Sequence, residues 1–420
     1  MAASMQDRAA DDQSWVGELV QTAVAGIPFY RDLLAGADAS RLDGLPTFDK
    51  QRTEHYGRFP LSAGGPAGAH RVVATSGTTG DRLFVAFDQA DLTRVGTWLE
   101  EVGRQVGMTS SDALLNTHCY GLWVGGPILD LLAHRSGACV VPLGPTSPAA
   151  VLHMLAGGVG TAISATPSYL RRLVETAEVT GFDLKGTGLR LGFIGAEAAE
   201  SALRRTLLAR LPDGFQWIEL YGLTETYGPS VAFAPDPEVA ELELNTQDFC
   251  IEVLDPRADT PVAPGAIGEL TITSRSPSRS PLIRYRTRDL VRVAAGEPAT
   301  PTRVSRIIGR ADDALKIGGV LMYPSAVAEI VTGILPASAE WRGIVRRCGS
   351  DDELFLEAEA PPSVCEAVQL AFHERVGLDV TVISVDGAAL TRSREKTRRV
   401  VIEQETGAAP PGPTRRTACG

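Results

Sequence analysis

The sequence predicts an α/β protein: a large N-terminal layered α/β domain with a β-rich subdomain, followed by a small mobile α+β C-terminal domain. Three observations support this fold class. The chain has 420 residues, short apolar segments alternate with helical segments over 72–211, and a separate strand and helix pattern follows residue 310. We therefore expect domains at 1–309 and 310–406, with 407–420 as a disordered tail rich in Gly, Pro and Ala.

The first element that we expect is an amphipathic helix within 14–34, ended by a turn at Pro28. The layered core follows, with strands at 114–117, 139–142 and 189–194 and helices at 149–155 and 167–180. Strands at 251–254, 268–273 and 289–293, separated by Pro, Gly and Ser turns, predict the β-rich subdomain. The C-terminal domain is expected to contain strands at 354–358 and 380–384 around a helix at 363–376.

The bulk composition excludes several classes of protein. With 44% hydrophobic and 22% charged residues, the chain matches a soluble globular protein, and no apolar run approaches the roughly 20 residues that span a bilayer. The first residues are acidic and lack an apolar signal core, so we expect a cytoplasmic protein without membrane contact. A net charge of -11 disfavours nucleic acid as a partner.

The number and spacing of the cysteines and lysines limit which kinds of site the chain can contain. The six cysteines form no C-x-x-C pair, which argues against a zinc ribbon or a disulfide scaffold, and we expect most of them to be reduced and buried. The chain has only four lysines, which are Lys50, Lys185, Lys316 and Lys396. A lysine that falls within a motif is therefore stronger evidence of a functional site than it would be in a lysine-rich chain.

The first candidate site is a loop of hydroxyls and glycines after a short apolar stretch. It follows Thr75 and consists of Ser76, Gly77, Thr78, Thr79 and Gly80. Glycines let backbone N–H groups converge on an anion, and the hydroxyls add donors without bulk, so the loop could wrap a phosphate. It lacks the lysine of a Walker A loop, and an ordinary turn explains the same composition.

The second candidate is the turn 219–225, which combines an aromatic ring, a hydroxyl and a carboxylate. Tyr221 could stack on a purine beside Gly222, Thr224 could reach a phosphate oxygen, and Glu225 could bind magnesium. Alone, such a turn is more often structural.

The third candidate is the segment 282–290, in which Arg284, Arg286 and Arg288 alternate and would share one strand face. Asp289 follows them, and its carboxylate could accept both hydroxyls of a ribose. The alternative interpretation is an edge strand kept soluble by charge, with Asp289 paired to an arginine.

Two charged segments complete the set. In 309–319, Arg310 could contact a nucleotide and Asp312 could act as a hinge, although a charged linker with a glycine hairpin has the same composition. The basic run 392–399 contains Lys396 and, taken alone, is typical of a solvated surface.

The order of these segments resembles the adenylate-forming superfamily of acyl-CoA synthetases, peptide-synthetase adenylation domains and luciferases. Within it the sequence is most similar to the phenylacetate-CoA ligase branch, over roughly residues 15 to 405. This likeness depends on four further segments: Tyr120-Gly121-Leu122 with Gly125-Gly126, Gly195-Ala196-Glu197, 281–287, and Met322-Tyr323-Pro324-Ser325.

The resemblance implies a role for each motif. Ser76 to Gly80 become the phosphate loop, Tyr221 the residue that stacks on adenine, and Asp289 the ribose clamp. Further nucleotide-binding residues are implied at Gly195, Ala196, Glu197, Gly222 and Arg310. The implied catalytic residues are Thr224, Glu225, which binds magnesium, and Lys396, a mobile lysine that bridges carboxylate and phosphate; Asp312 becomes the hinge.

The implied reaction is activation of a carboxylic acid by ATP and Mg²⁺ to an acyl-adenylate, followed by transfer to a thiol, with coenzyme A as the expected acceptor. The implied acid pocket contains Tyr120, Trp123 and Gly125, whose aromatic side chains suit an aryl or arylacetic acid, although both rings could equally belong to the core. The alternatives are an aryl-carrier-protein ligase, an amide-forming ligase, or a homologue that binds nucleotide without catalysis.

The sequence also departs from the family pattern. Asp81-Arg82-Leu83 follows the phosphate loop where relatives often have Lys-Pro, and Arg288 replaces the glycine that usually precedes Asp289. The segment 326–328 lacks a common glutamate, and Arg394-Glu395 stands in place of Glu-Gly. The segment 235–250 lacks the Cys and His of a zinc site found in some relatives, so we expect no zinc. These departures leave the acceptor open.

Overall fold

A computed structural model describes residues 14–75, 82–236, 241–297, 300–318, 320–336, 339–348, 351–386, 389–390 and 399–403. The chain divides into two compact units, Met1–Asp312 and Asp313–Gly420. The predicted tail 407–420 lies outside the described residues. None of the helices in the described ranges combines the length and apolar character that crossing a bilayer requires.

The N-terminal segment forms two helices where the sequence predicted one helix and a turn. Helix α1 (Ser14–Gly26) buries one apolar face, and Pro28 then begins a second helix, α2 (Pro28–Leu33). The expectation of a turn at Pro28 is therefore wrong. Proline is well tolerated at the first position of a helix, because its missing N–H has no partner there in any case. Two short 3₁₀ turns follow, η1 (Leu42–Gly44) and η2 (Gln51–Tyr56).

The core of the first unit is a sheet with the strand order β13-β9-β8-β7-β6-β5-β3-β4. Its strands are β3 (Ala113–Asn116), β4 (Cys139–Pro142), β5 (Ala162–Ala165), β6 (Leu191–Gly195), β7 (Gln216–Leu223), β8 (Gly228–Ala234), β9 (Glu241–Leu244) and β13 (Arg303–Ser305). The pairs from β4 to β7 are parallel, and those from β7 to β13 are antiparallel. Because β5, β6 and β7 run in parallel, their carboxyl ends meet at one edge of the sheet.

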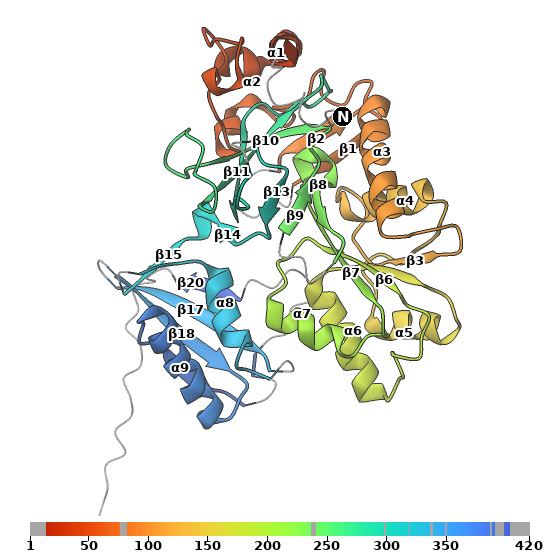
Figure 1. The fold of residues 1–420 in the computed structure, drawn as a ribbon, viewed down its shortest axis with the longest axis vertical. Helices are drawn as coiled ribbons and strands as arrows, with labels where there is room; N and C mark the ends of the chain where they lie inside the picture. Colours follow the sequence, from red (N-terminus) through yellow and green to blue (C-terminus); the bar gives the residue numbers. More distant parts are fainter. Residues whose placement is uncertain are drawn as a thin grey trace, which may run out of the picture. The chain divides into compact units, whose positions relative to one another are not determined.

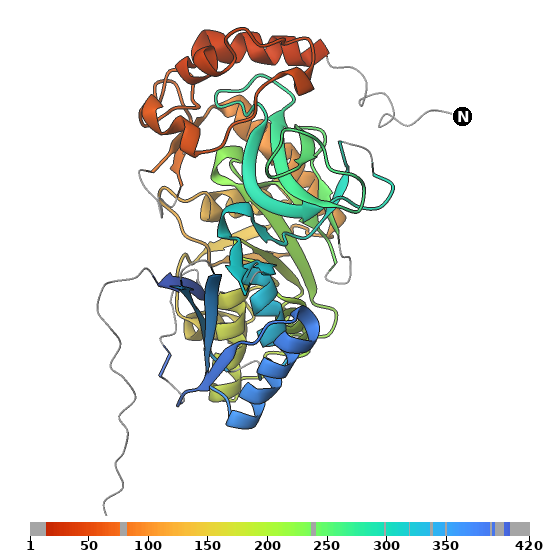
Figure 2. The same ribbon diagram turned by 90° about the vertical axis from the view of Figure 1, so that its left-hand side faces the viewer.

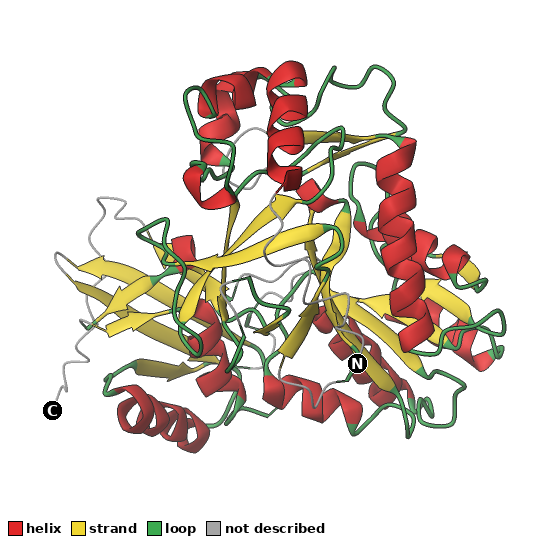
Figure 3. Cartoon of the chain, turned by 45° about the horizontal axis from the view of Figure 1, so that its top comes forward, coloured by secondary structure: helices red, strands yellow, loops and turns green. Residues whose placement is uncertain are grey.

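Helices cover both faces of this sheet (Figures 1 and 3). One set is α3 (Gln89–Gln105) and α4 (Gly125–Arg135), and the other is α5 (Pro148–Ala156), α6 (Pro167–Thr180) and α7 (Ser201–Leu208). Neighbouring residues of β3 show the division, since Leu114 belongs to the core under α3 and α4 and Leu115 to the core under α5 to α7. The layered α/β fold that the sequence predicted is confirmed.

The β-rich subdomain is an antiparallel sheet in the order β10-β11-β12-β14. It consists of β10 (Phe249–Leu254), β11 (Ile267–Ser274), β12 (Tyr285–Arg292) and β14 (Gly309–Arg310), and a hairpin of β1 (Arg71–Ala74) and β2 (Phe84–Phe87) lies in the same unit. Figure 2 shows the N-terminal helices, in red, beside these strands, in teal. The phenol of Tyr30 donates a 2.6 Å hydrogen bond to the carbonyl oxygen of Pro281 there.

The C-terminal unit has its own sheet, in the order β16-β15-β18-β17-β20, with β19 paired to β18. Its elements are β15 (Leu315–Ile317), β16 (Val320–Met322), α8 (Pro324–Thr332), β17 (Trp341–Cys348), β18 (Asp351–Ala358), α9 (Pro362–Val376), β19 (Thr381–Ser384) and β20 (Val400–Glu403). Apolar residues of both helices, such as Val327 and Phe372, share one core with the sheet.

The cysteines differ from the expectation in part. Cys250 and Cys365 are buried, as expected, but Cys119 and Cys139 are exposed. Cys139 opens β4, which is the edge strand of the large sheet, and Cys119 lies in the loop after β3. An edge strand and a loop offer less cover than the interior of a sheet, which explains the exposure.

Candidate active site

The turn after β7 carries the second sequence motif. β7 ends at Leu223 and continues as the 3₁₀ turn η3 (Thr224–Thr226). The pairing of β7 with β8 is irregular between Tyr221 and Leu223, and a Cβ atom at Gly222 would collide with the backbone of Gly228. Glycine is therefore required at position 222. The irregular pairing marks where regular strand structure stops, immediately before Glu225.

Strand β12 connects to both ends of this motif. The phenol of Tyr285 donates a 3.0 Å hydrogen bond to Oε1 of Glu225, and the phenol of Tyr221 donates one of 2.7 Å to Oδ2 of Asp289. Tyr285 and Asp289 both belong to β12. The fold thus brings the second and third sequence motifs together through two tyrosine–carboxylate pairs.

The fourth motif joins the same cluster. In the pairing of β12 with β14, Asp289 lies opposite Arg310. Nη1 of Arg310 lies 3.2 Å from Oδ1 of Asp289, and Nε of Arg310 lies 3.0 Å from Oδ1 of Asp312, in the 3₁₀ turn η4 (Ala311–Asp313). One guanidinium therefore connects the predicted ribose clamp with the predicted hinge residue.

Burial dominates the electrostatics of this cluster. Only 6% of Glu225 is exposed, and burial raises the pKa of its carboxyl, while the hydrogen bond from Tyr285 and the positive charges of Lys50 and Arg310 lower it. Burial also raises the pKa of Asp289, and Arg310 counteracts this effect. The pKa of Tyr221 is raised well above its usual value by burial and by Asp289, so its phenol stays protonated and acts as a hydrogen-bond donor.

The three arginines of the third motif do not form a charged edge strand. β12 lies inside its sheet, between β11 and β14, so the expectation of an edge strand is wrong, whereas the expected pairing of Asp289 with an arginine is confirmed, with Arg310 as the partner. Arg284 is 2% exposed and pairs with Glu252 at 3.0 Å, and Arg286 pairs with Glu269 and Asp259, each at 2.8 Å.

The three arginines point to the same side of the chain, since Arg284 and Arg286 both contact Asp259 and Arg286 and Arg288 both contact Glu269, but the backbone around them is irregular. Arg284 has a φ angle of 50° and Arg288 one of 68°, and both values interrupt regular strand geometry. The pairing of β11 with β12 shifts register between Glu269 and Thr271 at the same place. The positive φ at 288 is a conformation that glycine adopts without steric cost and that an L-residue such as arginine seldom adopts.

The predicted loop of Gly195, Ala196 and Glu197 follows β6. A Cβ atom at Gly195 would lie 2.8 Å from the carbonyl oxygen of Leu220 on β7, so glycine allows the two strands to approach closely. Ala196 has a φ angle of 67°. The carboxylate of Glu197 accepts hydrogen bonds from the backbone N–H of Ser168, at 3.2 Å, and from its hydroxyl, at 3.0 Å. The loop is thereby tied to the first turn of α6, at the carboxyl edge of the sheet.

The predicted acid-pocket residues lie between β3 and α4. The phenol of Tyr120 donates a 2.9 Å hydrogen bond to Asp130 and accepts one of 3.1 Å from Asn116, so its polar end is bound within the protein. Trp123 is 41% exposed and Gly125 begins α4. The alternative that Trp123 is a core aromatic is therefore wrong.

Two predicted groups lie outside the described residues: Ser76, Gly77, Thr78, Thr79 and Gly80 of the phosphate loop, and Lys396. Immediately before the loop, both the backbone and the side chain of Thr75 are hydrogen-bonded to the backbone of Leu83. Its backbone N–H donates to the carbonyl of Leu83 at 3.0 Å, and its hydroxyl accepts a 3.2 Å hydrogen bond from the N–H of Leu83.

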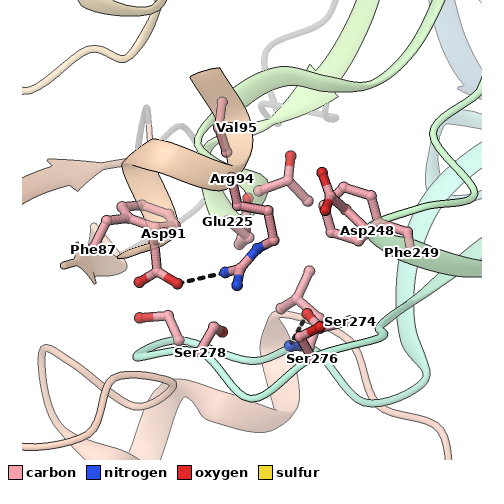
Figure 4. Close-up of a pocket in the computed structure, with 13 residues that line it drawn as sticks. Phe87, Asp91, Arg94, Val95, Glu225, Asp248, Phe249, Ser274, Ser276 and Ser278 are labelled. Carbon is pink, nitrogen blue, oxygen red and sulfur yellow. Dashed lines mark hydrogen bonds and ion pairs between the residues drawn. The ribbon is translucent and has the colours of Figure 1, made fainter. Parts of the chain in front are cut away.

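A small cavity lies against Glu225, between α3 and the serine-rich segment 274–280 (Figure 4). In this cavity Arg94 forms a 2.6 Å ion pair with Asp91, and burial raises the pKa values of Asp91 and Asp248. The sequence interpretation missed these residues, because α3 shows only the signals of an ordinary capped helix. It also missed Tyr285, although this residue falls within the third motif.

The described residues contain no group of three or more His, Cys, Asp or Glu side chains arranged to bind a metal. Magnesium commonly binds one or two carboxylates and completes its shell with water and substrate phosphates. A single buried carboxylate such as Glu225 fits a magnesium ion that arrives with a nucleotide. The expectation of no zinc stays a prediction.

Comparison with known proteins identifies the class. Residues 70–280 match the family of AMP-binding enzymes, and the chain belongs to this family. It is 31% identical to the phenylacetate-coenzyme A ligase of Escherichia coli over 398 residues, which is 90% of this chain and 91% of that protein. The ligase of the same name from Pseudomonas putida is 32% identical and covers 80% of this chain and 78% of its own length.

Solved structures agree on the fold. 2-Hydroxyisobutyryl-CoA ligase, in the postadenylation state with 2-HIB-AMP, superposes with a TM-score of 0.83 at 21% identity, covering 96% of this chain and 91% of its own. O-Succinylbenzoate coenzyme A synthetase from Bacillus subtilis, in complex with AMP, gives 0.58 at 20% identity, covering 77% and 66%. The predicted adenylate-forming superfamily, the likeness to phenylacetate-CoA ligases and the class of AMP-forming ligase are confirmed.

Proposed function

We propose that this enzyme uses ATP and Mg²⁺ to convert an aryl or arylacetic acid into an acyl-adenylate and then transfers the acyl group to the thiol of coenzyme A. The observation that carries the proposal is the cluster in which Tyr221, Asp289 and Arg310 are hydrogen-bonded in series, with the carboxylates of Asp289 and Glu225 buried. The names of the curated relatives support the acid and the acceptor.

The cluster has the polar groups that a nucleoside monophosphate needs. The Asp289 carboxylate, which now accepts hydrogen bonds from Tyr221 and Arg310, would accept the ribose hydroxyls. The ring of Tyr221 would stack on adenine, and the Arg310 guanidinium would contact the nucleotide. The loop of Gly195, Ala196 and Glu197 would line the nucleotide from the neighbouring strand end.

In the first half-reaction, an oxygen of the substrate carboxylate attacks the α-phosphorus of ATP, and the bond to the pyrophosphate oxygen breaks. Both reactants are anions, so the enzyme must hold them in line, and positioning of this kind can supply about 7 to 11 kcal/mol. A magnesium ion held by Glu225 would neutralise phosphate charge. Thr224 would hydrogen-bond a phosphate oxygen, and Lys396 would bridge the carboxylate and the phosphate.

In the second half-reaction, the thiolate attacks the acyl carbonyl carbon, and AMP leaves with the electrons of the mixed anhydride bond. We propose Asp312, the last residue of the first unit, as the hinge that lets the C-terminal unit change position between the two steps. The exposed ring of Trp123 would contact the acid, beside Tyr120 and Gly125.

The test is carboxylate-dependent exchange of labelled pyrophosphate into ATP, without acceptor, across benzoic, phenylacetic, amino-substituted and aliphatic acids. We expect strong exchange with an aryl or arylacetic acid, and AMP release that then depends on coenzyme A. Exchange only with aliphatic acids would overturn the substrate class. AMP release that depends on a carrier protein or an amine, and not on coenzyme A, would overturn the acceptor.

A further inference from the structure

The loop between β3 and α4 contacts two segments of the candidate active site. The backbone N–H of Ala74, at the end of β1, donates a 3.0 Å hydrogen bond to the carbonyl oxygen of Leu122 in this loop. A Cβ atom at Gly228, the first residue of β8, would lie 3.2 Å from Cγ2 of Val124. The loop therefore contacts the strand before the predicted phosphate loop and the strand that follows the turn with Glu225.

The ring of Tyr120 is packed tightly within this loop. A Cβ atom at Gly126, in the first turn of α4, would lie 2.9 Å from Cγ and Cδ1 of Tyr120, so only glycine leaves room for the ring. A Cβ atom at Gly144, in the loop after β4, would lie 3.7 Å from Cδ2 of the same ring. Tyr120 is nevertheless only half-buried, so part of its ring is left for a ligand to contact.

A polar network binds the phenol of Tyr120. The phenol donates a 2.9 Å hydrogen bond to Oδ1 of Asp130 on α4, and Nδ2 of Asn116 lies 2.7 Å from the same carboxylate oxygen. Asn116, the last residue of β3, is fully buried, and its Oδ1 accepts a 2.7 Å hydrogen bond from the hydroxyl of Ser164 on β5. Burial and the hydrogen bond to Asp130 raise the pKa of Tyr120, so its phenol stays protonated and remains a donor.

The carboxylate of Asp130 has no cation to balance its charge. Among the residues that the structure describes, it forms no ion pair with a basic side chain. A half-buried carboxylate in this position costs stability compared with an apolar residue, and the neighbouring residues Ile128, Leu129 and Leu132 of α4 are buried in the core. The contacts of Asp130 with Asn116 and Tyr120 thus suit a role in placing Tyr120 better than a role in stabilising the helix.

We propose that Asp130 is a positioning residue of the acid pocket, which holds the phenol of Tyr120 so that the ring of Tyr120 forms a fixed wall against the aryl or arylacetic acid. The inference rests on the proposed function, because it takes the acid to bind beside Tyr120. Since the phenol proton is donated to Asp130, Tyr120 would contact the acid through its ring carbons. A ring that is already held in place need not be ordered when the acid binds, so Asp130 would increase the affinity for the acid.

Pyrophosphate exchange on the full-length chain tests the proposal when the apparent KM values for the acid and for ATP are measured separately. We expect Asp130→Ala to raise the KM for the acid roughly three- to tenfold, because the acid must then order the Tyr120 ring itself. The KM for ATP and the maximal exchange rate should stay close to the wild-type values. Asp130→Asn keeps an acceptor oxygen for the phenol, so it should restore most of the affinity for the acid.

A double variant tests whether Asp130 acts through Tyr120. Tyr120→Phe keeps the packed ring and removes only the phenol, so it should raise the KM for the acid about as much as Asp130→Ala. The double variant should show no further rise, because both changes break the same hydrogen bond. Asp213→Ala is the matched control, since it removes an exposed carboxylate from the same unit, and it should match the wild type.

An unchanged KM for the acid in Tyr120→Phe would overturn the proposal, even if Asp130→Ala failed to fold. Effects that add in the double variant would also overturn it, as would an equal rise in the KM for ATP. If the wild type exchanged pyrophosphate with no acid of the panel, the proposed function would fail, and this inference with it. Exchange by the wild type with unchanged variants would remove only the role of Asp130.

Discussion

The phenol of Tyr221 donates a 2.7 Å hydrogen bond to Asp289, which joins the end of β7 to β12 across 68 positions of sequence. The same carboxylate accepts a hydrogen bond from Arg310. Three separate sequence motifs therefore meet at one carboxylate, that of Asp289.

Asp289→Ala should weaken AMP binding by roughly ten- to a hundredfold, because a hydrogen bond to a charged group contributes about 1.5 to 3 kcal/mol. Calorimetric titration with AMP measures the effect. Tyr221→Phe keeps the ring and removes only the phenol that donates to Asp289, so it should bind AMP more tightly than Asp289→Ala. Equal AMP affinity in Asp289→Ala and the wild type would contradict the ribose-clamp assignment.

Lys396→Ala should slow acyl-adenylate formation on the order of a hundredfold, since it removes a positive charge from the crowded anionic transition state. Transfer from a preformed acyl-adenylate to coenzyme A should be largely unaffected. Single-turnover rates of the two half-reactions measure this separation, with Lys185→Ala as the control for loss of a lysine charge. An equal slowing of both steps would argue against a role confined to adenylation.

Glu252→Ala should lower the free energy of unfolding by about 3 to 5 kcal/mol, because it leaves the Arg284 guanidinium buried without its carboxylate. Urea denaturation followed by tryptophan fluorescence measures the loss. Glu178→Ala, which removes the exposed partner of Arg210, should cost less than about 1 kcal/mol. Similar losses of unfolding free energy in the two variants would show that burial of the Arg284–Glu252 pair does not increase its contribution to stability.

Burial raises the pKa of the Cys250 thiol to about 11, from an ordinary value of 9.0. The folded state therefore holds this proton more tightly than the unfolded state. The stabilisation is fully present below pH 9, and it should fall by about 3 kcal/mol as the pH rises to about 11. Urea denaturation across this range should show a steeper decline for the wild type than for Cys250→Ala, and parallel curves would refute the assignment.

Thiol alkylation should separate the described cysteines in the native protein. Iodoacetamide at pH 8, followed by mass spectrometry, should label the exposed Cys119 and Cys139 quickly. Cys250 and Cys365 are buried, and burial raises the pKa of both thiols, so they should react only after denaturation. Rapid labelling of Cys365 in the folded chain would contradict its position in the core of the C-terminal unit.

Local pattern in the sequence was enough to predict much of the fold. Helix α6 spans the predicted residues 167–180, because apolar periodicity and the cap Thr166 act within a few turns. The order of the motifs was enough to predict the superfamily, since each motif is a short continuous segment whose residue types are visible without the fold. Pro28 misled the interpretation, because the same residue can end one helix or begin the next.

Only the tertiary structure decided how the motifs meet. Tyr285 bonds Glu225 across 60 positions, and the arginines at 284, 286 and 288 turn inward and contact residues 45, 47 and 49, whereas their alternation alone was compatible with a charged edge. These contacts depend on strand register, on the shift between Glu269 and Thr271 and on the left-handed backbone at Arg288. Such features arise when distant segments pack against one another, and no local pattern of residue types specifies them.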